Sequence, residues 1–118
     1  MWGGFESRKF PRVKADCRIY IEQFQNAETL TSTTENIGIG GICVVLKKPL
    51  PKFSRLRIQL DLADGEKTIS CDGRVVWMVE SRNLVTEQAT HDAGIEFLNL
   101  AEDARLRIEK IIKSKITA

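Results

Sequence analysis

Hydrophobic and polar residues alternate with a period of two along the first part of the chain. In residues 12–24 this alternation predicts a half-buried β-strand. Its apolar positions are Val13, Ala15, Cys17, Ile19 and Ile21. Residues 25–28 have the composition of a turn, and the Thr-rich segment 29–34 predicts a second strand. We therefore expect an antiparallel hairpin here.

Further strands are predicted at intervals of about ten residues. They are expected at 42–46, 54–62, 66–79 and 92–98. The segment 54–62 alternates most clearly, with Leu56, Ile58, Leu60 and Leu62 on its apolar side. Gly73 interrupts the longest segment and predicts a bulge or a bend. Residues 80–91 are polar and unpatterned, which is typical of a surface loop.

The C-terminal segment changes to a helical period. Its apolar residues Ala101, Ala104, Ile108, Ile111 and Ile112 fall on one stripe of an α-helix. Asn99 is predicted to cap this helix, with Glu102 completing a capping-box-like pair. The short strands followed by one amphipathic helix predict a mainly β fold, a six-stranded antiparallel β-barrel with a C-terminal α-helix.

Composition indicates a single globular domain. The chain has 118 residues, of which 42% are hydrophobic and 29% charged. No apolar run approaches the ~20 residues that span a bilayer, and the N-terminal segment lacks the apolar core expected of a signal peptide. The cysteines at 17, 43 and 71 are widely spaced, as expected of reduced core residues. We therefore expect a cytoplasmic protein with no membrane insertion.

The sequence offers no constellation of residues for catalysis or for metal binding. His91 is the one histidine, and no Ser or Cys motif accompanies it. The glycines at 38–41 lack the Lys-Ser/Thr pair of a phosphate-binding loop, and a strand rather than a helix follows them. We therefore expect no enzymatic activity, no metal and no cofactor.

The glycine-rich segment ENIGIGGICVV at 35–45 is the strongest candidate for a ligand site. Gly38 and Gly41 have no side chains, which leaves room for a ligand against the backbone. Asn36 offers amide donors and an acceptor for a base edge. Near the N-terminus, Arg8 and Arg12 supply guanidinium groups that bind phosphate oxygens in pairs and stack on aromatic rings.

These two segments resemble the signature motifs of PilZ domains, which are bacterial receptors for the second messenger cyclic di-GMP. The first motif of the family, Arg-x-x-x-Arg, is matched by Arg8 and Arg12 in ESRKFPRV. The second, Asp/Asn-x-Ser-x-x-Gly, is matched by Asn36 and Gly41 in ENIGIGGICV. The segments GRVVW and AGIEFLNLAEDARLRIEKII resemble the long inner strand, the last strand and the helix of the family.

The resemblance implies a receptor that signals through a protein partner. Cyclic di-GMP is expected to bind the motif residues Arg8, Arg12, Asn36, Gly38 and Gly41. Lys9 and Trp77 are further candidates, although Trp77 is also explained by ordinary barrel packing. A flexible arm at 1–7, ahead of a PilZ-like domain at 8–116, would change conformation when the ligand binds. No binding of a nucleic acid polymer is expected.

One departure from the motif favours an alternative interpretation. Gly38 stands where the family has Ser, so one hydroxyl hydrogen bond is missing. This loss corresponds to about 0.5–1.5 kcal/mol, or a roughly two- to twelve-fold weaker affinity. A degenerate PilZ-type interaction module that does not bind nucleotide is therefore the second hypothesis. Binding of single-stranded RNA or DNA is a third, which only Phe10 and Tyr20 favour through their neighbouring cations.

Overall fold

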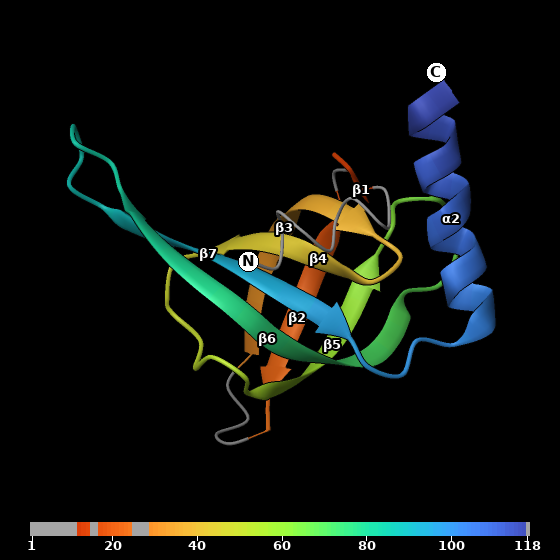
Figure 1. The fold of residues 1–118 in the computed structure, drawn as a ribbon, viewed down its shortest axis with the longest axis horizontal. Coiled ribbons are helices and arrows are strands. Elements are labelled where there is room, and N and C mark those ends of the chain that lie inside the picture. The colour runs from red at the N-terminus through yellow and green to blue at the C-terminus, as the bar shows by residue number, and fades with distance from the viewer. Residues whose placement is uncertain (1–11, 15–16, 25–28, 118) are drawn as a thin grey trace.

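The computed structural model describes residues 12–14, 17–24 and 29–117 (Figure 1). It contains strands β1 (Arg12–Val13), β2 (Arg18–Gln23), β3 (Thr29–Gly38), β4 (Gly41–Leu46), β5 (Arg55–Asp61), β6 (Ile69–Arg82) and β7 (Ala89–Phe97), followed by helix α2 (Glu102–Thr117). The predicted mainly β fold with one C-terminal helix is confirmed. The predicted arm at 1–7, together with Arg8 and Lys9, lies outside the described residues.

The six long strands form a closed ring of antiparallel pairs. The sheet order is β1-β3-β2-β5-β6-β7-β4, and an additional pairing of β3 with β4 joins its ends. Within this ring, each of β2 to β7 pairs with two of the other five, which is the arrangement of a six-stranded barrel. The short strand β1 is the seventh strand and was not predicted as a separate element.

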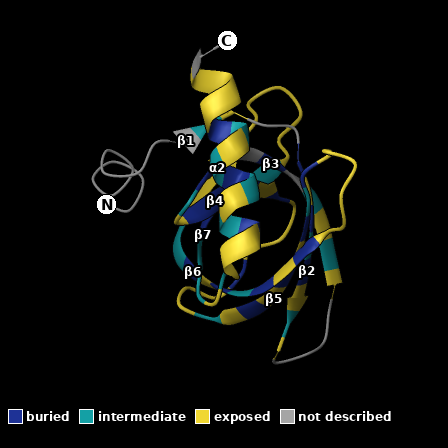
Figure 2. Ribbon diagram, turned by 90° about the vertical axis from the view of Figure 1, so that its right-hand side faces the viewer, coloured by how far each residue is buried: buried dark blue, intermediate teal, exposed yellow. Residues whose placement is uncertain are grey.

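Alternating apolar residues fill the interior of this barrel. In β5, Leu56, Ile58 and Leu60 are fully buried, and Ile58 pairs with Ile21 of β2. Their polar neighbours in the same strand are exposed, so buried and exposed residues alternate along the ribbon (Figure 2). The period of two in the sequence thus reports which face of each strand lies in the core.

The predicted strand at 12–24 is interrupted rather than continuous. Both β1 and β2 pair with β3, with Val13 opposite Ile37 and Arg18 opposite Thr33. The stretch from Val13 to Arg18 is one residue longer than the facing stretch of β3 from Thr33 to Ile37. This irregularity separates a short strand beside the end of β3 from the longer strand beside its beginning.

The surface loop predicted at 80–91 is confirmed only for residues 83–88, because its two ends are strands. β6 continues to Arg82 and β7 begins at Ala89, so the two strands project from the barrel as a hairpin (Figure 1). The irregularity predicted at Gly73 lies further along β6, where the register of β6 on β7 shifts between Val75 and Trp77. An added Cβ at Gly73 would lie 2.4 Å from Ile58 Cδ1, so packing inside the barrel requires this glycine.

Helix α2 buries most of its predicted apolar stripe, but Ala101 precedes the helix and is exposed. Ala104, Ile108 and Ile112 are buried, and the helix contacts β1 and β3. The predicted cap at Asn99 is wrong: Asn99 Oδ1 instead accepts a hydrogen bond of 2.6 Å from the backbone N–H of Asp72. The carbonyl of Ala101 accepts the first helical hydrogen bond, from the N–H of Arg105, at 2.9 Å.

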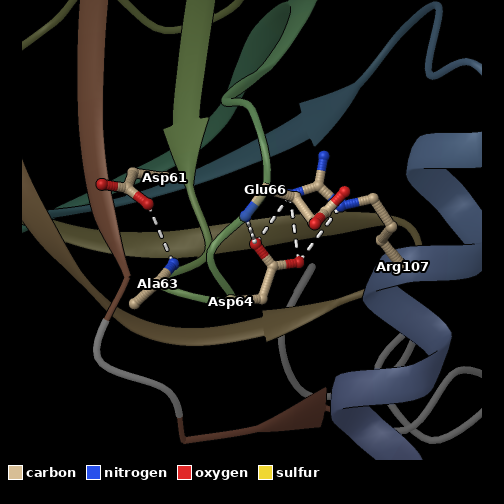
Figure 3. Close-up of polar contacts among 5 residues, drawn as sticks. All are labelled: Asp61, Ala63, Asp64, Glu66 and Arg107. Carbon is tan, nitrogen blue, oxygen red and sulfur yellow. Dashed lines mark hydrogen bonds and ion pairs between the residues drawn. The ribbon is translucent and has the colours of Figure 1, made fainter.

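A second attachment joins the helix to the turn between β5 and β6 (Figure 3). Arg107 donates two hydrogen bonds from Nη2 to the carboxylate of Asp64, at 2.9 and 3.0 Å, and a third from Nε at 3.1 Å. The same carboxylate accepts the backbone N–H of Glu66 at 3.1 Å. The Arg107 guanidinium lowers the pKa of Asp64 from its ordinary value.

Among the helices in the described part of the chain, none combines the length and the apolar character that crossing a membrane requires.

Replacement of Asp64 tests this attachment. The pKa of Asp64 is lower in the folded than in the unfolded protein, so the ionised carboxylate stabilises the fold at pH values above the unfolded-state pKa. This stabilisation is lost as the pH falls through the folded-state pKa. We expect Asp64→Asn to lower the free energy of unfolding by about 1 kcal/mol near neutral pH. Urea denaturation should show this difference disappearing at low pH.

Lys110→Ala is the matched control, because Lys110 is an exposed cation in the turn of α2 that follows Arg107. It should leave the unfolding free energy unchanged at both pH values. An equal effect of Asp64→Asn at neutral and low pH would contradict a contribution from the ionised carboxylate.

Candidate functional site

The glycine-rich segment forms the end of one strand and the start of the next. It was predicted as a loop from residue 35, but Asn36 and Gly38 lie within β3, and β4 already begins at Gly41. Only Ile39 and Gly40 lie between the two strands. The turn is attached to β7, because the N–H of Phe97 donates a hydrogen bond of 2.9 Å to the carbonyl of Gly40.

Strand β1 lies beside the end of β3. Arg12 is opposite Gly38, and Val13 is opposite Ile37. The backbone of Arg12 is therefore adjacent to the segment that carries Asn36, although the two motifs are separated in sequence. Of the predicted cationic residues, only Arg12 falls within the described part of the chain.

Four residues form a row across neighbouring strands. Asn36 of β3 pairs with Cys43 of β4, which pairs with Gly94 of β7, which in turn pairs with Trp77 of β6. The neighbours of Cys43 in sequence, Ile42 and Val44, both belong to the core, so Cys43 lies on the opposite, outer face of the barrel. The row therefore runs along the outside of the barrel.

The predicted burial of the three cysteines is confirmed, but Cys43 is buried on a different face from the other two. All three cysteines are buried thiols, but Cys43 is not a member of the core cluster that contains Cys17 and Cys71. Burial and the neighbouring Asp72 carboxylate raise the pKa of the Cys71 thiol to about 11. Such a thiol is protonated at neutral pH and is therefore a poor nucleophile.

Asn36 combines a backbone irregularity with a polar atom that needs a donor. The register of β3 on β4 shifts between Thr34 and Asn36, so a β-bulge directly precedes this residue. Asn36 Oδ1 is buried, and no group in the described residues donates a hydrogen bond to it. Leaving a buried acceptor unsatisfied costs about 1–3 kcal/mol. A ligand that brings an N–H to this atom would remove the cost.

At the other end of the row, Trp77 lies directly over Gly94. A Cβ atom added to Gly94 would come within 2.1 Å of Trp77 Nε1 and 2.3 Å of its Cε2. Gly94 thus allows the indole ring to approach the backbone of β7. Residue 94 was not predicted, because the contact depends on the pairing of β6 with β7 after the register shift at Val75.

Of the two adjacent glycines 40 and 41, only Gly41 has a structural explanation. An added Cβ at Gly41 would lie 2.3 Å from the carbonyl oxygen of Ile95 and 3.1 Å from Glu96 Cα, whereas one at Gly40 would meet nothing within 4 Å. Neither Gly40 nor Gly41 has a positive φ. The close approach of β7 therefore explains Gly41 without a ligand.

Acidic residues neutralise the arginines of the neighbouring strands. Arg74 Nη2 lies 2.6 Å from Glu96 Oε1, and Glu96 is the register partner of Gly41. Arg55 and Arg57 lie 2.9 and 3.5 Å from the two carboxylate oxygens of Asp72. A phosphate group at the row would thus need other cations, which the sequence supplies immediately ahead of β1.

Within the described residues, no group of three or more His, Cys, Asp or Glu side chains is suitably arranged for a metal ion. The expected absence of a metal and of enzymatic activity stays a prediction for the whole chain.

The model of one protein family covers nearly the whole chain. The PilZ domain model matches residues 6–114. A comparison with curated proteins finds no match.

Solved structures share the fold. The PilZ domain with c-di-GMP of YcgR from Escherichia coli is similar over 93% of this chain and 92% of its own, at 19% identity and a TM-score of 0.72. The K. pneumonia MrkH–c-di-GMP complex matches 93% of this chain and 52% of its own, at 23% identity and a TM-score of 0.77. The Bacillus subtilis inhibitor of motility MotI matches 93% of this chain and 51% of its own, at 20% identity and a TM-score of 0.76. The chain thus spans about half the length of the last two proteins.

The different surroundings of two neighbouring glycines give a matched test of the turn. We expect Gly41→Ala to lower the free energy of unfolding by about 1–3 kcal/mol, because its Cβ would meet the backbone of β7. Gly40→Ala should change it by less than about 0.5 kcal/mol, because that Cβ would point into open space. Urea denaturation followed by circular dichroism measures both, and equal stabilities of the two variants would contradict the close approach.

Proposed function

The chain belongs to the PilZ domain family, and from this premise we propose that it is a cyclic di-GMP receptor that signals through a protein partner. The observation that carries the proposal is the register of β1 on β3, in which Arg12 lies opposite Gly38. This register brings the backbones of the two motif segments together. Two of the similar structures, those of YcgR and MrkH, are described as complexes with c-di-GMP.

In the proposed complex, Arg8 and Arg12 bind the phosphates, with Lys9 adding positive charge. Arg8 precedes Arg12 by four residues, so its Cα lies within ~14 Å of that of Arg12. Arginine suits this role because its planar donors fit phosphate oxygens in pairs. These cations would neutralise a dianionic ligand, because the arginines of β5 and β6 are already paired with carboxylates.

Asn36 is proposed to bind the edge of a guanine base. Its buried Oδ1 accepts no hydrogen bond from the described residues, and a guanine carries N–H donors for such an atom. Gly38 and Gly41 would lie beneath the ligand, and Trp77 would border the site from the other end of the cross-strand row. The positions of Asn36 and Trp77 in one row support this assignment.

The response to ligand is proposed to be a change in the conformation of the N-terminal arm. Arg12 belongs both to the first motif and to β1, and β1 contacts β3 and helix α2. Ligand bound at Arg12 would therefore act on the segment from which the arm extends. The reordered arm would then present a new surface to the protein partner.

We also infer a cytoplasmic location and the absence of enzymatic activity. The names of the similar structures describe c-di-GMP complexes and regulators rather than enzymes. One of them is described as a c-di-GMP-dependent transcription regulatory factor. The expectation that this chain binds no nucleic acid polymer therefore has no support from the comparisons and stays untested.

A PilZ-type interaction module that does not bind nucleotide is the alternative function. The feature that favours it is Gly38, which replaces the motif Ser and removes one hydroxyl. The two functions differ in one measurable property, the affinity for cyclic di-GMP.

Calorimetric titration with cyclic di-GMP distinguishes these functions. We expect heat of binding below ~100 μM ligand, and an affinity that Arg12→Ala weakens by about ten- to one-hundred-fold, since a hydrogen bond to a charged group contributes about 1.5–3 kcal/mol. Asn36→Ala removes a neutral hydrogen bond and should weaken affinity about two- to twelve-fold.

Lys67→Ala is the control for loss of charge, because Lys67 is an exposed cation in the segment between β5 and β6. It should bind as tightly as the wild type. No heat from the wild-type protein would favour the interaction module, whereas unchanged binding by both Arg8→Ala and Arg12→Ala would show that the ligand binds elsewhere.

A further inference from the structure

The hairpin of β6 and β7 extends away from the barrel (Figure 1). The pairing of β7 with β4 ends at His91, but its pairing with β6 continues to Ala89, opposite Arg82. Residues 83–88 close the hairpin at its outer end. We refer to these six residues as the hairpin tip.

Two large apolar side chains occupy the tip. Leu84 is 92% exposed and Val85 is 91% exposed, the highest values among the exposed large hydrophobic residues of the described chain. Single exposed apolar residues are common on protein surfaces and need no explanation. Here two adjacent ones lie at the end of a projecting element, where folding of the domain gains almost nothing from them.

Hydrogen bonds give the tip a defined shape. The side-chain Oδ1 of Asn83 accepts the N–H groups of Val85 and Thr86 at 2.8 and 3.0 Å. The backbone of Asn83 exchanges hydrogen bonds with the next residues of the tip, donating to Gln88 at 2.9 Å and accepting from Glu87 at 2.8 Å. The backbone of the tip is thus held in one conformation, which lowers the backbone entropy lost when Leu84 and Val85 are buried in a partner.

The charges around the tip discriminate between classes of partner. Glu80 and Glu87 are exposed, and the one arginine of this region, Arg82, uses Nη1 to donate a 3.0 Å hydrogen bond to the carbonyl of Glu87. Arg82 Nη2 also lies 3.9 Å from the carboxylate of Glu80. An anionic bilayer attracts segments with an excess of cations, which this tip lacks. Two tips in contact would bring their carboxylates together, which disfavours a second copy of the chain.

We propose that Leu84 and Val85 dock into an apolar pocket on a protein partner, and that the rim of this pocket is basic. The carboxylates of Glu80 and Glu87 complement such a rim, while the two apolar side chains supply the buried contact. This inference adds a contact surface to the proposed function. It requires no nucleotide, so it can fail or succeed independently of cyclic di-GMP binding.

The first step of the test identifies the partner. The full-length protein, carrying the photo-crosslinker p-benzoyl-L-phenylalanine at position 85, is irradiated in its native bacterium, and cross-linked proteins are identified by mass spectrometry. The same crosslinker at position 106 is the control, because Leu106 is an exposed apolar residue of helix α2. A protein cross-linked from the tip alone is then purified for titration.

The second step measures the affinity of that purified protein without cyclic di-GMP. We expect the Leu84→Ser/Val85→Ser variant to bind at least about tenfold more weakly than wild type, because both anchors lose apolar area. Leu106→Ser should bind within about twofold of wild type. Affinity should fall as salt rises, and Glu87→Lys should weaken binding. Both residues of the double variant are almost fully exposed, and an unchanged circular dichroism spectrum would verify its fold.

Four results would overturn the proposal. They are the absence of a cross-link specific to the tip, a cross-link to a second copy of the chain, and equal affinity of the double variant for the purified partner. The fourth is sedimentation of the wild-type protein, but not of the double variant, with vesicles of phosphatidylglycerol and phosphatidylethanolamine. That result would assign the tip to a membrane surface.

Discussion

The pairing of β3 on both of its edges is the constraint on which the rest of this structure depends. One edge pairs with β1 and β2, and the other pairs with β4. The second pairing closes the barrel, and the first attaches the N-terminal segment to it. Because Asn36 pairs with Cys43 of β4 and directly precedes the two residues of β3 that pair with β1, closure of the barrel and the approach of the two motif segments depend on the same strand.

Two register shifts place the end residues of the outer row on the outside of this closed barrel. One precedes Asn36 in β3, and the other precedes Trp77 in β6. Within a regular strand, an insertion of one residue reverses which face each later side chain occupies. The shift in β6 therefore leaves Val75 in the core while Trp77 covers Gly94 on the outside. Both ends of the candidate site thus depend on an irregularity of the strand that carries them.

Sequence patterns predicted the parts of the fold that have one buried and one exposed face. The alternation at 54–62 identified β5 because its apolar residues alone enter the core. The projecting hairpin escaped prediction because its outer part has no buried face, so polar residues occupy both sides. The resemblance to the PilZ motifs implied one site for Arg12 and Asn36, and the register places the backbone of Arg12 opposite Gly38. The packing roles of Gly41 and Gly94 depend on strand register, which a single sequence does not specify.

The hairpin of β6 and β7 carries both Trp77 and the exposed tip. Beyond His91 the hairpin consists of β6 and β7 without support from β4. A two-stranded hairpin is at best marginally stable by itself in water. The hydrogen bonds of Asn83 compensate by fixing the turn, yet they do so around two side chains that contribute nothing to the core. A contact with another molecule explains such an element better than the stability of the domain does.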